Sequence, residues 1–597
     1  MLPPRPDFQR LPIVLLDGLW SLRLDARDRG LRDRWGAAPV LPYDGPIRVP
    51  FAIETEASGV ALANPPEVFW YYREVDRPAE PGALLLHFGA VDQEACVFWN
   101  DLLLGRHVGG YSSFALVIDA DRVLDRNRLV VRVRDSKRSR LPRGKQTNRK
   151  QPWAVFYRQC SGIWQSVWLE SIPAAFIKSV RMQSVNDGFR VRIEPGGDEQ
   201  CQAGARLLWK LYSGLRQDPT LESFPIYEHE VGHGEQQLAA SQSGQEFHIP
   251  LQKIRSWCPE DPHMYGLELG LTLAGGAHDS VFLNTGHRLL SIDPSRGRVL
   301  LNGRDLYQRL VLCQGYYERG AYSAPDEEHM RRDLDLASGA GFNGLRIHEK
   351  IEDPRFLYLC DRRGLVVWQE MPSPPIFSRL DPEPFFAEWK SVIERDRNHP
   401  SIICRVVFNE SWGLLSVAWS RRAREQLRKA YEFTKNLDPD VLVVDNSGFD
   451  HVRTDLLDVH HYLQNQNKIQ KLYRDLKEPA GLRSRWWHLL YMIFPTRIVK
   501  APWLPGAEQN RAPVLISELG GFGFYGERGG QDLFLEVQQA LLEIAKHEHI
   551  RGFCYTQLYD VYQEKNGLFD FAREARLDIE RLRETVHLCG RPDAPGH

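Results

Sequence analysis

The chain has 597 residues, which is too long for one hydrophobic core and predicts three or four domains. Its 76 Lys and Arg residues nearly balance its 78 Asp and Glu residues, and no long block of one sign occurs. This balance argues against nucleic acid or an anionic membrane surface as a partner. The 16 Trp, 21 Tyr and 27 Phe residues fit carbohydrate stacking, although an aromatic-rich core needs the same rings.

The nine cysteines are scattered and contain no C-x-x-C pair. This distribution predicts buried thiols and argues against a disulfide framework or a zinc site. Residues 1–30 hold one short apolar patch that Asp17 interrupts, so we expect no signal peptide. The most apolar later segment, residues 486–494, is too short to span a bilayer. We therefore expect a cytoplasmic protein with no membrane partner, no metal and no cofactor.

Residues 1–171 show short strand patterns, many turn formers and almost no helical periodicity. Strand-like apolar runs occupy residues 85–88, 95–99 and 129–133. This pattern predicts an all-β domain of the jelly-roll type. Residues 172–292 continue with alternating apolar and polar residues, as at 189–193, and predict an immunoglobulin-like β-sandwich. We expect this second domain to serve as a scaffold, because it contains no cluster of enzyme-like side chains.

From residue 293 the pattern changes to strands that alternate with amphipathic helices, which is typical of a parallel sheet. The predicted strands are residues 309–314, 342–347, 365–370, 401–408, 441–445, 456–461, 514–518 and 552–557. The predicted helices are residues 326–338, 384–397, 419–435, 533–546 and, as a closing helix, 573–586. Eight such strands predict a C-terminal (β/α)8 TIM barrel over residues 293–597.

The carboxyl ends of the barrel strands hold the candidate catalytic residues, because barrel enzymes place their chemistry there. Glu410 follows the fourth strand and Glu518 ends the seventh, so the two side chains should face each other. Retaining glycoside hydrolysis needs one carboxylic acid and one carboxylate, with the carboxyl groups about 5 Å apart. Arg346, at the second strand, should lower the pKa of Glu518, whereas Glu410 needs a raised pKa.

Several segments carry a family resemblance. In the predicted N-terminal domain they are VPFAIE (49–54), HFGAVD (87–92), HVGGY (107–111) and SGIWQ (161–165). In the predicted barrel they are GFNGLR (341–346), DRRGLVVW (361–368), RNHPSI (397–402) and the pair Asn409 and Glu410. On these motifs the chain resembles glycoside hydrolase family 2, which contains β-galactosidases, β-glucuronidases and β-mannosidases. The resemblance extends over nearly the full length.

The resemblance implies that Glu410 is the general acid/base and Glu518 the nucleophile, with net retention at the anomeric carbon. We expect Asn409 to contact the 2-hydroxyl of the sugar and Tyr462 to donate a hydrogen bond to Glu518. The other candidates for substrate binding are Arg346, Trp412, Tyr555, Lys350, Glu370 and His460. Trp412 and Tyr555 would stack on the sugar, and Lys350 and Glu370 would contact its hydroxyl groups.

The chain also departs from the family pattern. Arg405 lies inside the fourth strand and must find a partner within or behind the barrel. The segment after the second strand is HEKIED (348–353), where galactosidase-like members often carry a His-Tyr pair. Glucuronidase-like members use an Asn-x-Lys element near the end of the barrel, and here residues 564–567 are EKNG.

We therefore expect an exo-acting retaining β-glycosidase that removes a terminal galactoside-like residue from an oligosaccharide or glycoside. One alternative is the same chemistry on a β-galactofuranoside, an arabinoside or a β-glucuronide. Another is a non-catalytic carbohydrate-binding protein on a retired barrel. The aromatic-rich connection at 464–513 is predicted to form a wall of the sugar pocket, with a packed helical insertion as its alternative. A homo-oligomer is compatible with the sequence.

Overall fold

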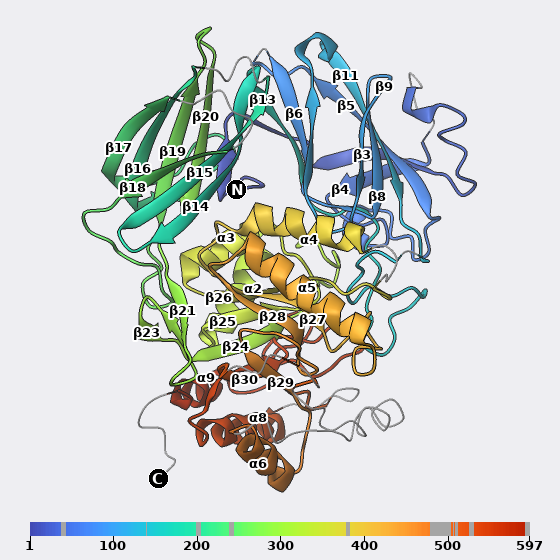
Figure 1. Cartoon of the computed structure of the whole chain (residues 1–597). Coiled ribbons are helices and arrows are strands. Elements are labelled where there is room, and N and C mark those ends of the chain that lie inside the picture. Colours follow the sequence, from blue (N-terminus) through green and yellow to red (C-terminus); the bar gives the residue numbers. More distant parts are fainter. Residues whose placement is uncertain are drawn as a thin grey trace.

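Two β-sandwiches lie side by side against one face of a barrel of parallel strands, as Figure 1 shows. This computed structural model describes residues 1–590 except 38–42, 81, 139, 199–203, 238–243, 378–381, 478–502, 505–506, 508–510 and 524–529. The predicted multidomain architecture of jelly roll, immunoglobulin-like sandwich and TIM barrel is confirmed. No helix among the described residues is long and apolar enough to cross a membrane.

The N-terminal sandwich packs a six-stranded sheet against a four-stranded sheet. The larger sheet has the order β4 (Gly45–Val49), β3 (Gly18–Leu24), β5 (Val68–Asp76), β11 (Arg126–Arg134), β8 (Glu94–Trp99), β9 (Leu102–Val108). The smaller sheet has the order β10 (Phe114–Ile118), β6 (Ala83–Phe88), β13 (Val167–Ile172), β2 (Ile13–Leu15). A separate pair joins β12 (Gly162–Ile163) and β7 (Val91–Asp92). Short 3-10 helices are η1 (Trp35–Ala37), η2 (Glu56–Ser58) and η3 (Ala120–Arg122). Alternate apolar residues of the two sheets meet in one buried cluster, because successive strand side chains point to opposite faces.

The second sandwich contains one strand from the very start of the chain. Its five-stranded sheet has the order β1 (Phe8–Arg10), β20 (His278–Thr285), β19 (Tyr265–Thr272), β16 (Arg206–Gln217), β17 (Ile226–Gln237). Its three-stranded sheet has the order β14 (Ala175–Val185), β15 (Gly188–Gly197), β18 (Gln245–Pro250). Because β1 pairs with β20, residues 8–10 join the second sandwich rather than the first. The predicted boundaries near 171 and 292 stay a prediction.

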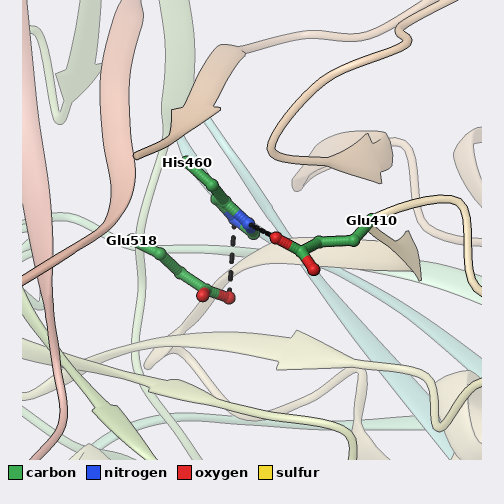
Figure 2. A group of neighbouring side chains, drawn as sticks. All are labelled: Glu410, His460 and Glu518. Carbon is green, nitrogen blue, oxygen red and sulfur yellow. Dashed lines mark hydrogen bonds and ion pairs between the residues drawn. The ribbon is translucent and has the colours of Figure 1, made fainter. Parts of the chain in front are cut away.

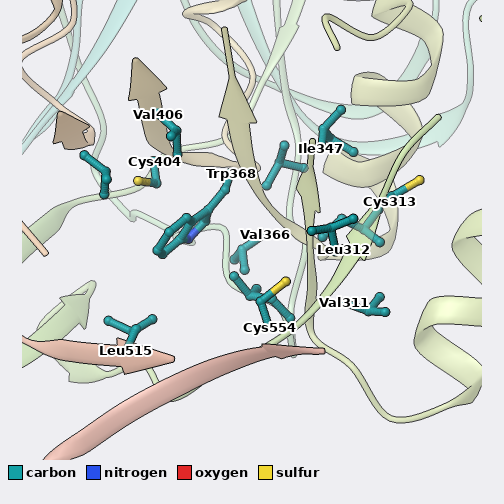
Figure 3. Packing of buried hydrophobic residues seen from close by; sticks show 14 of the residues in the cluster. Val311, Leu312, Cys313, Ile347, Val366, Trp368, Cys404, Val406, Leu515 and Cys554 are labelled. Carbon is teal, nitrogen blue, oxygen red and sulfur yellow. The ribbon is translucent and has the colours of Figure 1, made fainter. Parts of the chain in front are cut away.

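The barrel follows a small sheet of β21 (Leu290–Asp293), β22 (Arg298–Leu301) and β23 (Arg304–Asp305). Its strands are β24 (Gln308–Cys313), β25 (Gly344–Ile347), β26 (Val366–Glu370), β27 (Ile402–Asn409), β28 (Leu442–Ser447), β29 (Leu457–His460), β30 (Val514–Gly520) and β31 (Ile550–Thr556). Paired neighbours among these strands run parallel, and every strand lies within two residues of its prediction at either end. The interior is a packed core of side chains such as Trp368, Cys404 and Cys554 (Figure 3).

Helices cover the outside of the barrel (Figure 1). They are α2 (Glu327–Gly339), α3 (Pro354–Arg363), α4 (Glu383–Asp396), α5 (Arg421–Leu437), α6 (Gln466–Asp475), α8 (Gly530–Ala545) and α9 (Ile579–Leu588). The Ser420 side chain caps α5 by accepting from the Ala423 amide, and Leu427, Ala430 and Thr434 form its buried stripe. The closing helix α9 begins six residues later than predicted, because Asp578 is its N-cap.

The RNHPSI motif joins the barrel to the second sandwich. The Asn398 side chain accepts a 3.0 Å hydrogen bond from the Met182 amide and donates a 2.8 Å bond to the Val180 carbonyl. His399 lies 2.5 Å from an Asp361 carboxylate oxygen in a fully buried pair. The segment between α4 and β27 is therefore fixed to the second sandwich and to α3.

Two further expectations concern particular side chains. Arg405 is completely buried and pairs with Asp438 at 2.9 Å and with Gln369, so the expected partner behind the barrel strand is present. Of the aromatic connection at 464–513, Trp503 is described; it is buried and packs on His451. Trp486, Trp487, Tyr491 and Phe494 lie outside the described residues, so the predicted pocket wall is not tested.

Candidate active site

Glu410 stands in a tight turn directly after the last residue of β27. Its backbone has φ 48° and that of Ser411 has φ 61°, which is the left-handed region that non-glycine residues seldom adopt. Main-chain and side-chain bonds from the end of β28 hold this turn. The Glu410 amide donates to the Ser447 carbonyl at 3.0 Å, and the Ser411 amide donates to the Asn446 side chain at 2.7 Å. The turn therefore directs the half-buried Glu410 side chain toward His460 and Glu518 (Figure 2).

Glu518 lies within β30, and both of its carboxylate oxygens receive hydrogen bonds. Arg346 donates to Oε1 at 2.8 Å, and the Tyr462 hydroxyl donates to Oε2. Burial raises the pKa of the Glu518 carboxyl, but electrostatic interactions with His460 and with the Arg346 guanidinium lower it more. The net result is a pKa well below the usual range of a glutamic acid, so the side chain is a carboxylate at neutral pH.

The His460 ring lies between the two glutamates, as Figure 2 shows. Its Nδ1 is 3.0 Å from Oε1 of Glu410, and its Nε2 is 3.6 Å from Oε1 of Glu518. One carboxylate oxygen of Glu410 and one of Glu518 lie within 4.8 Å of each other. This separation matches the roughly 5 Å spacing of retaining glycosidases and is shorter than the spacing of inverting ones, about 6.5–9.5 Å.

Arg346 connects several of these groups because its guanidinium is fully buried at their centre. Its Nε and Nη2 donate to Oε2 of Glu370 at 2.9 and 2.6 Å, and Nη2 also donates to the Asn409 side chain at 2.9 Å. Burial raises the pKa of Glu370, but Arg346 and His348 lower it to about 2 overall. Two carboxylates thus neutralise one buried cation, which fixes the orientation of Glu518 and Asn409.

Glu410, His460 and Glu518 also meet the spacing of a metal-binding group. The donor set argues for another use, since Arg346 lies 2.8 Å from the Glu518 oxygen and would repel a cation there. Both Glu518 oxygens already accept hydrogen bonds from protein donors. The cluster therefore suits an acid/base and nucleophile pair better than a metal centre.

Two predicted substrate contacts are wrong. The Lys350 ammonium is buried and donates to the Gly315 and Tyr322 carbonyls and to Glu352, so it does not reach a sugar. Tyr555 is fully buried and its ring lies against Gly520, which leaves no face for stacking. Both residues were predicted from their positions near strand ends, but their side chains are buried within the protein.

Other predicted residues lie at the barrel mouth. Asn409 and His460 are mostly buried beside the two glutamates, and Tyr462 is about half exposed with its hydroxyl on Glu518. Trp412 is half-buried and packs against Phe156. Glu370 is completely buried and contacts Arg346 and the His348 ring, so it positions Arg346 rather than touching a ligand.

Residues from the N-terminal sandwich also reach the barrel mouth, and sequence reasoning missed them. The Tyr157 hydroxyl donates to Glu564 at 2.5 Å, and the Lys145 ammonium lies 4.6 Å from the centroid of the Trp412 ring. Both stand in the connection between β11 and β12, residues 135–161. A connection of this length in a compact domain is usually functional. Its length could therefore have indicated from the sequence that it takes part in the active site.

Comparisons with known proteins agree with this geometry. The family model described as "Glycosyl hydrolases family 2, TIM barrel domain" matches residues 383–520. A β-glucuronidase of Chlorocebus aethiops is 25% identical over 486 residues, which cover 73% of this chain and 69% of that protein. A β-galactosidase of Bacteroides ovatus is 24% identical over 413 residues, which cover 65% of this chain and 44% of that protein. A solved structure of a β-D-glucuronidase for Dictyoglomus thermophilum aligns with a TM-score of 0.74 at 17% identity, covering 100% of both chains.

The matched segment contains the turn after β27, the end of β29 and the end of β30. These are the parts that carry Glu410, His460 and Glu518. The sequence relatives extend beyond the barrel, and the structural alignment covers both sandwiches. The protein is accordingly a glycoside hydrolase. The motifs, the family match and the relatives together show that the chain belongs to glycoside hydrolase family 2.

Proposed function

We propose that Glu518 is the nucleophile and Glu410 the general acid/base of a double displacement at a terminal β-linked sugar. The observation that carries this proposal is the oxygen-to-oxygen separation within 4.8 Å, since inverting enzymes separate their carboxyl groups by about 6.5–9.5 Å to admit the attacking water. Glu518 attacks the anomeric carbon as its bond to the leaving oxygen breaks, and that oxygen takes the proton of Glu410. Glu410, now a carboxylate, removes a proton from water, whose oxygen displaces Glu518 from the anomeric carbon.

The surrounding side chains support these roles. Arg346 and Tyr462 stabilise the Glu518 carboxylate before attack, and both can release part of their hydrogen bonding when Glu518 becomes an ester. Asn409 is held by Arg346 beside Glu410 and would contact the 2-hydroxyl of the sugar. His460 contacts Glu410 and lies between the two carboxyl groups, so it would help to hold their separation.

The terminal sugar is proposed to be a galactoside-like residue or a uronic acid. The relatives include both a β-galactosidase and β-glucuronidases, which supports both sugars. The loop from the N-terminal sandwich hydrogen-bonds to the barrel rim, which favours a substrate that enters by its chain end. A furanoside or an arabinoside has no comparable support, and two opposed glutamates do not favour a retired barrel.

The experiment that tests the mechanism is hydrolysis of a panel of nitrophenyl β-glycosides, followed by proton NMR of the first sugar anomer released. We expect the β-anomer to appear first and to equilibrate later with the α-anomer. Initial release of the α-anomer would contradict double displacement. Hydrolysis of internal bonds in a long oligosaccharide, without release of single sugars, would contradict the exo mode.

A further inference from the structure

A loop of the N-terminal sandwich is bonded to two sides of the barrel rim. The amides of Arg143 and Gly144 donate to the Ser373 carbonyl at 3.2 and 3.1 Å. On the other side, the Gln563 side chain donates to the carbonyls of Ala154 and Phe156 at 2.7 and 3.1 Å. The segment between these anchors is therefore part of the active-site wall, although it belongs to another domain.

Lys145 is a buried cation of this loop, with 7% of its surface exposed. Its ammonium lies over the Trp412 ring, and Trp412 follows Glu410 by two positions. Within the described parts of the chain, the Lys145 ammonium has neither a hydrogen bond nor an ion pair with a carboxylate. Lys350, another buried lysine, differs in this respect, because its ammonium donates to three oxygen acceptors. A lysine this buried normally has a charged or hydrogen-bonded partner, so a partner arriving with the substrate would complete the site.

The surroundings place the Lys145 charge close to the catalytic pair. This charge acts to lower the pKa of His348 and Glu349, which follow β25, and of Glu564, which follows β31. The charge of Glu518 acts to raise the pKa of Glu564, and the interaction with His348 acts to lower the pKa of Glu518. Lys145 therefore lies at the mouth of the barrel, within electrostatic reach of the groups that surround Glu518.

The carboxyl groups that interact electrostatically with Lys145 do not neutralise this cation fully. Glu349 accepts hydrogen bonds from the amide and hydroxyl of Ser373, and burial raises its pKa to about 8. Glu564 accepts from the Tyr157 hydroxyl, and burial raises its pKa above the usual range. Glu349 therefore favours the uncharged form near neutral pH, and burial makes Glu564 harder to ionise, so the Lys145 charge is not fully balanced by its neighbours.

We propose that Lys145 binds the carboxylate of a terminal uronic acid in the sugar site in front of Glu410 and Glu518. This assignment rests on the proposed function, since it names the class of sugar that the two glutamates cleave. The N-terminal sandwich thereby supplies the residue that selects the substrate, while the barrel supplies the chemistry. A carboxylate of the sugar gives the ammonium its missing charge-assisted hydrogen bond.

The test compares Lys145→Met, which keeps the stem length and removes the charge, with Lys145→Arg, which keeps the charge. Lys150→Met is the matched control, because Lys150 lies on the same loop and is exposed. The substrates are nitrophenyl β-glucuronide and β-galacturonide, with the β-glucoside and β-galactoside as their neutral counterparts. We expect Lys145→Met to lower kcat/KM on the better uronide about 100-fold, which corresponds to losing one partner of a buried charge pair. Lys145→Arg should recover part of that loss, and the control should behave as the unmodified enzyme.

Other outcomes would overturn the assignment. If Lys145→Met slows the neutral glycosides as much as the uronides, Lys145 contacts a hydroxyl group common to both. If the unmodified enzyme cleaves only neutral glycosides, the site does not select a uronic acid. If no glycoside is cleaved, the proposed function fails, and calorimetric titration with glucuronic and galacturonic acid then decides on Lys145. Saturable binding that is lost in Lys145→Met but kept in Lys150→Met would support the assignment, and absence of binding would reject it.

Discussion

Arg346, on β25, donates a 2.8 Å hydrogen bond from Nη1 to Oε1 of Glu518 on β30, across the barrel mouth. The same guanidinium also donates to Asn409, which precedes Glu410. One buried cation thus links the strand of the proposed nucleophile to the strand of the proposed acid/base. This link explains how two carboxyl groups far apart in sequence keep a separation that suits retention.

Replacing Arg346 should change the pH dependence of the enzyme. The lowered pKa keeps Glu518 ionised well below neutral pH, so activity should persist until the pH falls through that low value. In Arg346→Gln the acid limb of kcat/KM should move to higher pH, and kcat should fall about 100-fold, as when one electrostatic donor is lost. The pH profile measures both, with Glu370→Gln as the comparison because it retains Arg346. An unchanged acid limb would show that Arg346 does not set the charge of Glu518.

Glu410→Gln should be sensitive to the leaving group. Removing the general acid should lower turnover of alkyl glycosides by about 100-fold to 10,000-fold. A dinitrophenyl glycoside needs no proton on its leaving oxygen, so its first step should be nearly normal. Stopped-flow measurement of the burst separates the first step from the second. Glu432→Gln, on the outer helix α5, serves as control. Equal losses on both substrates would reject Glu410 as the acid.

Glu518→Ala should abolish hydrolysis and leave space for a small anion near the anomeric carbon. Added azide should then attack from the same side and, with no second displacement, give an α-glycosyl azide from a β-glycoside. Proton NMR of the product measures this configuration. A β-configured azide product, or activity without azide, would contradict the role of Glu518 as nucleophile.

Gly144→Ala should displace the loop that carries Lys145. A Cβ at this position would lie 2.3 Å from the Glu349 carbonyl oxygen, and the backbone has φ +54°. We expect a clear rise in KM with a smaller change in melting temperature, because the loop moves while the sandwich core remains. Gly59→Ala is the matched control, since Gly59 has φ +79° with nothing within 4 Å of the added carbon. If both variants behave alike, backbone strain rather than loop contact explains the effect.

His451 should make stability depend on pH. Its ring is buried between Asp445 at 2.7 Å and the Asp458 carbonyl at 3.0 Å. Burial lowers the pKa of His451, but the hydrogen bond and charge of Asp445 raise it to about 9. An unfolded histidine titrates at about 6.5, so this stabilisation is complete below about pH 6.5 and is lost as the pH rises through about 9.

His451→Gln should therefore destabilise the protein more below about pH 6.5 than above about pH 9, by a difference on the order of 3 kcal/mol in unfolding free energy. Thermal unfolding across this pH range measures the difference. The exposed His229→Gln is the control and should show no such trend. Equal destabilisation at both ends of the range would mean that the His451 charge does not contribute.

The barrel could be predicted from sequence because its information is local. Runs such as the one that forms β27 are short, apolar and β-branched, and all eight residues of this strand are buried. Once the eight strands were counted, parallel closure placed Glu410 and Glu518 at the same end. The expected hydrogen bond of Tyr462 to Glu518 is likewise present, since Tyr462 follows β29 and Glu518 lies near the end of the neighbouring strand β30.

The sequence by itself thus determined the order of the elements and which residues stand at strand ends. Only the tertiary structure decided where their side chains point, so that Lys350 and Tyr555 turn inward while His460 lies between the glutamates. It also decided that Lys145 and Tyr157, from another domain, complete the barrel mouth. The physical reason is that periodicity encodes a residue's face on its own element, whereas domain docking depends on packing between surfaces hundreds of residues apart.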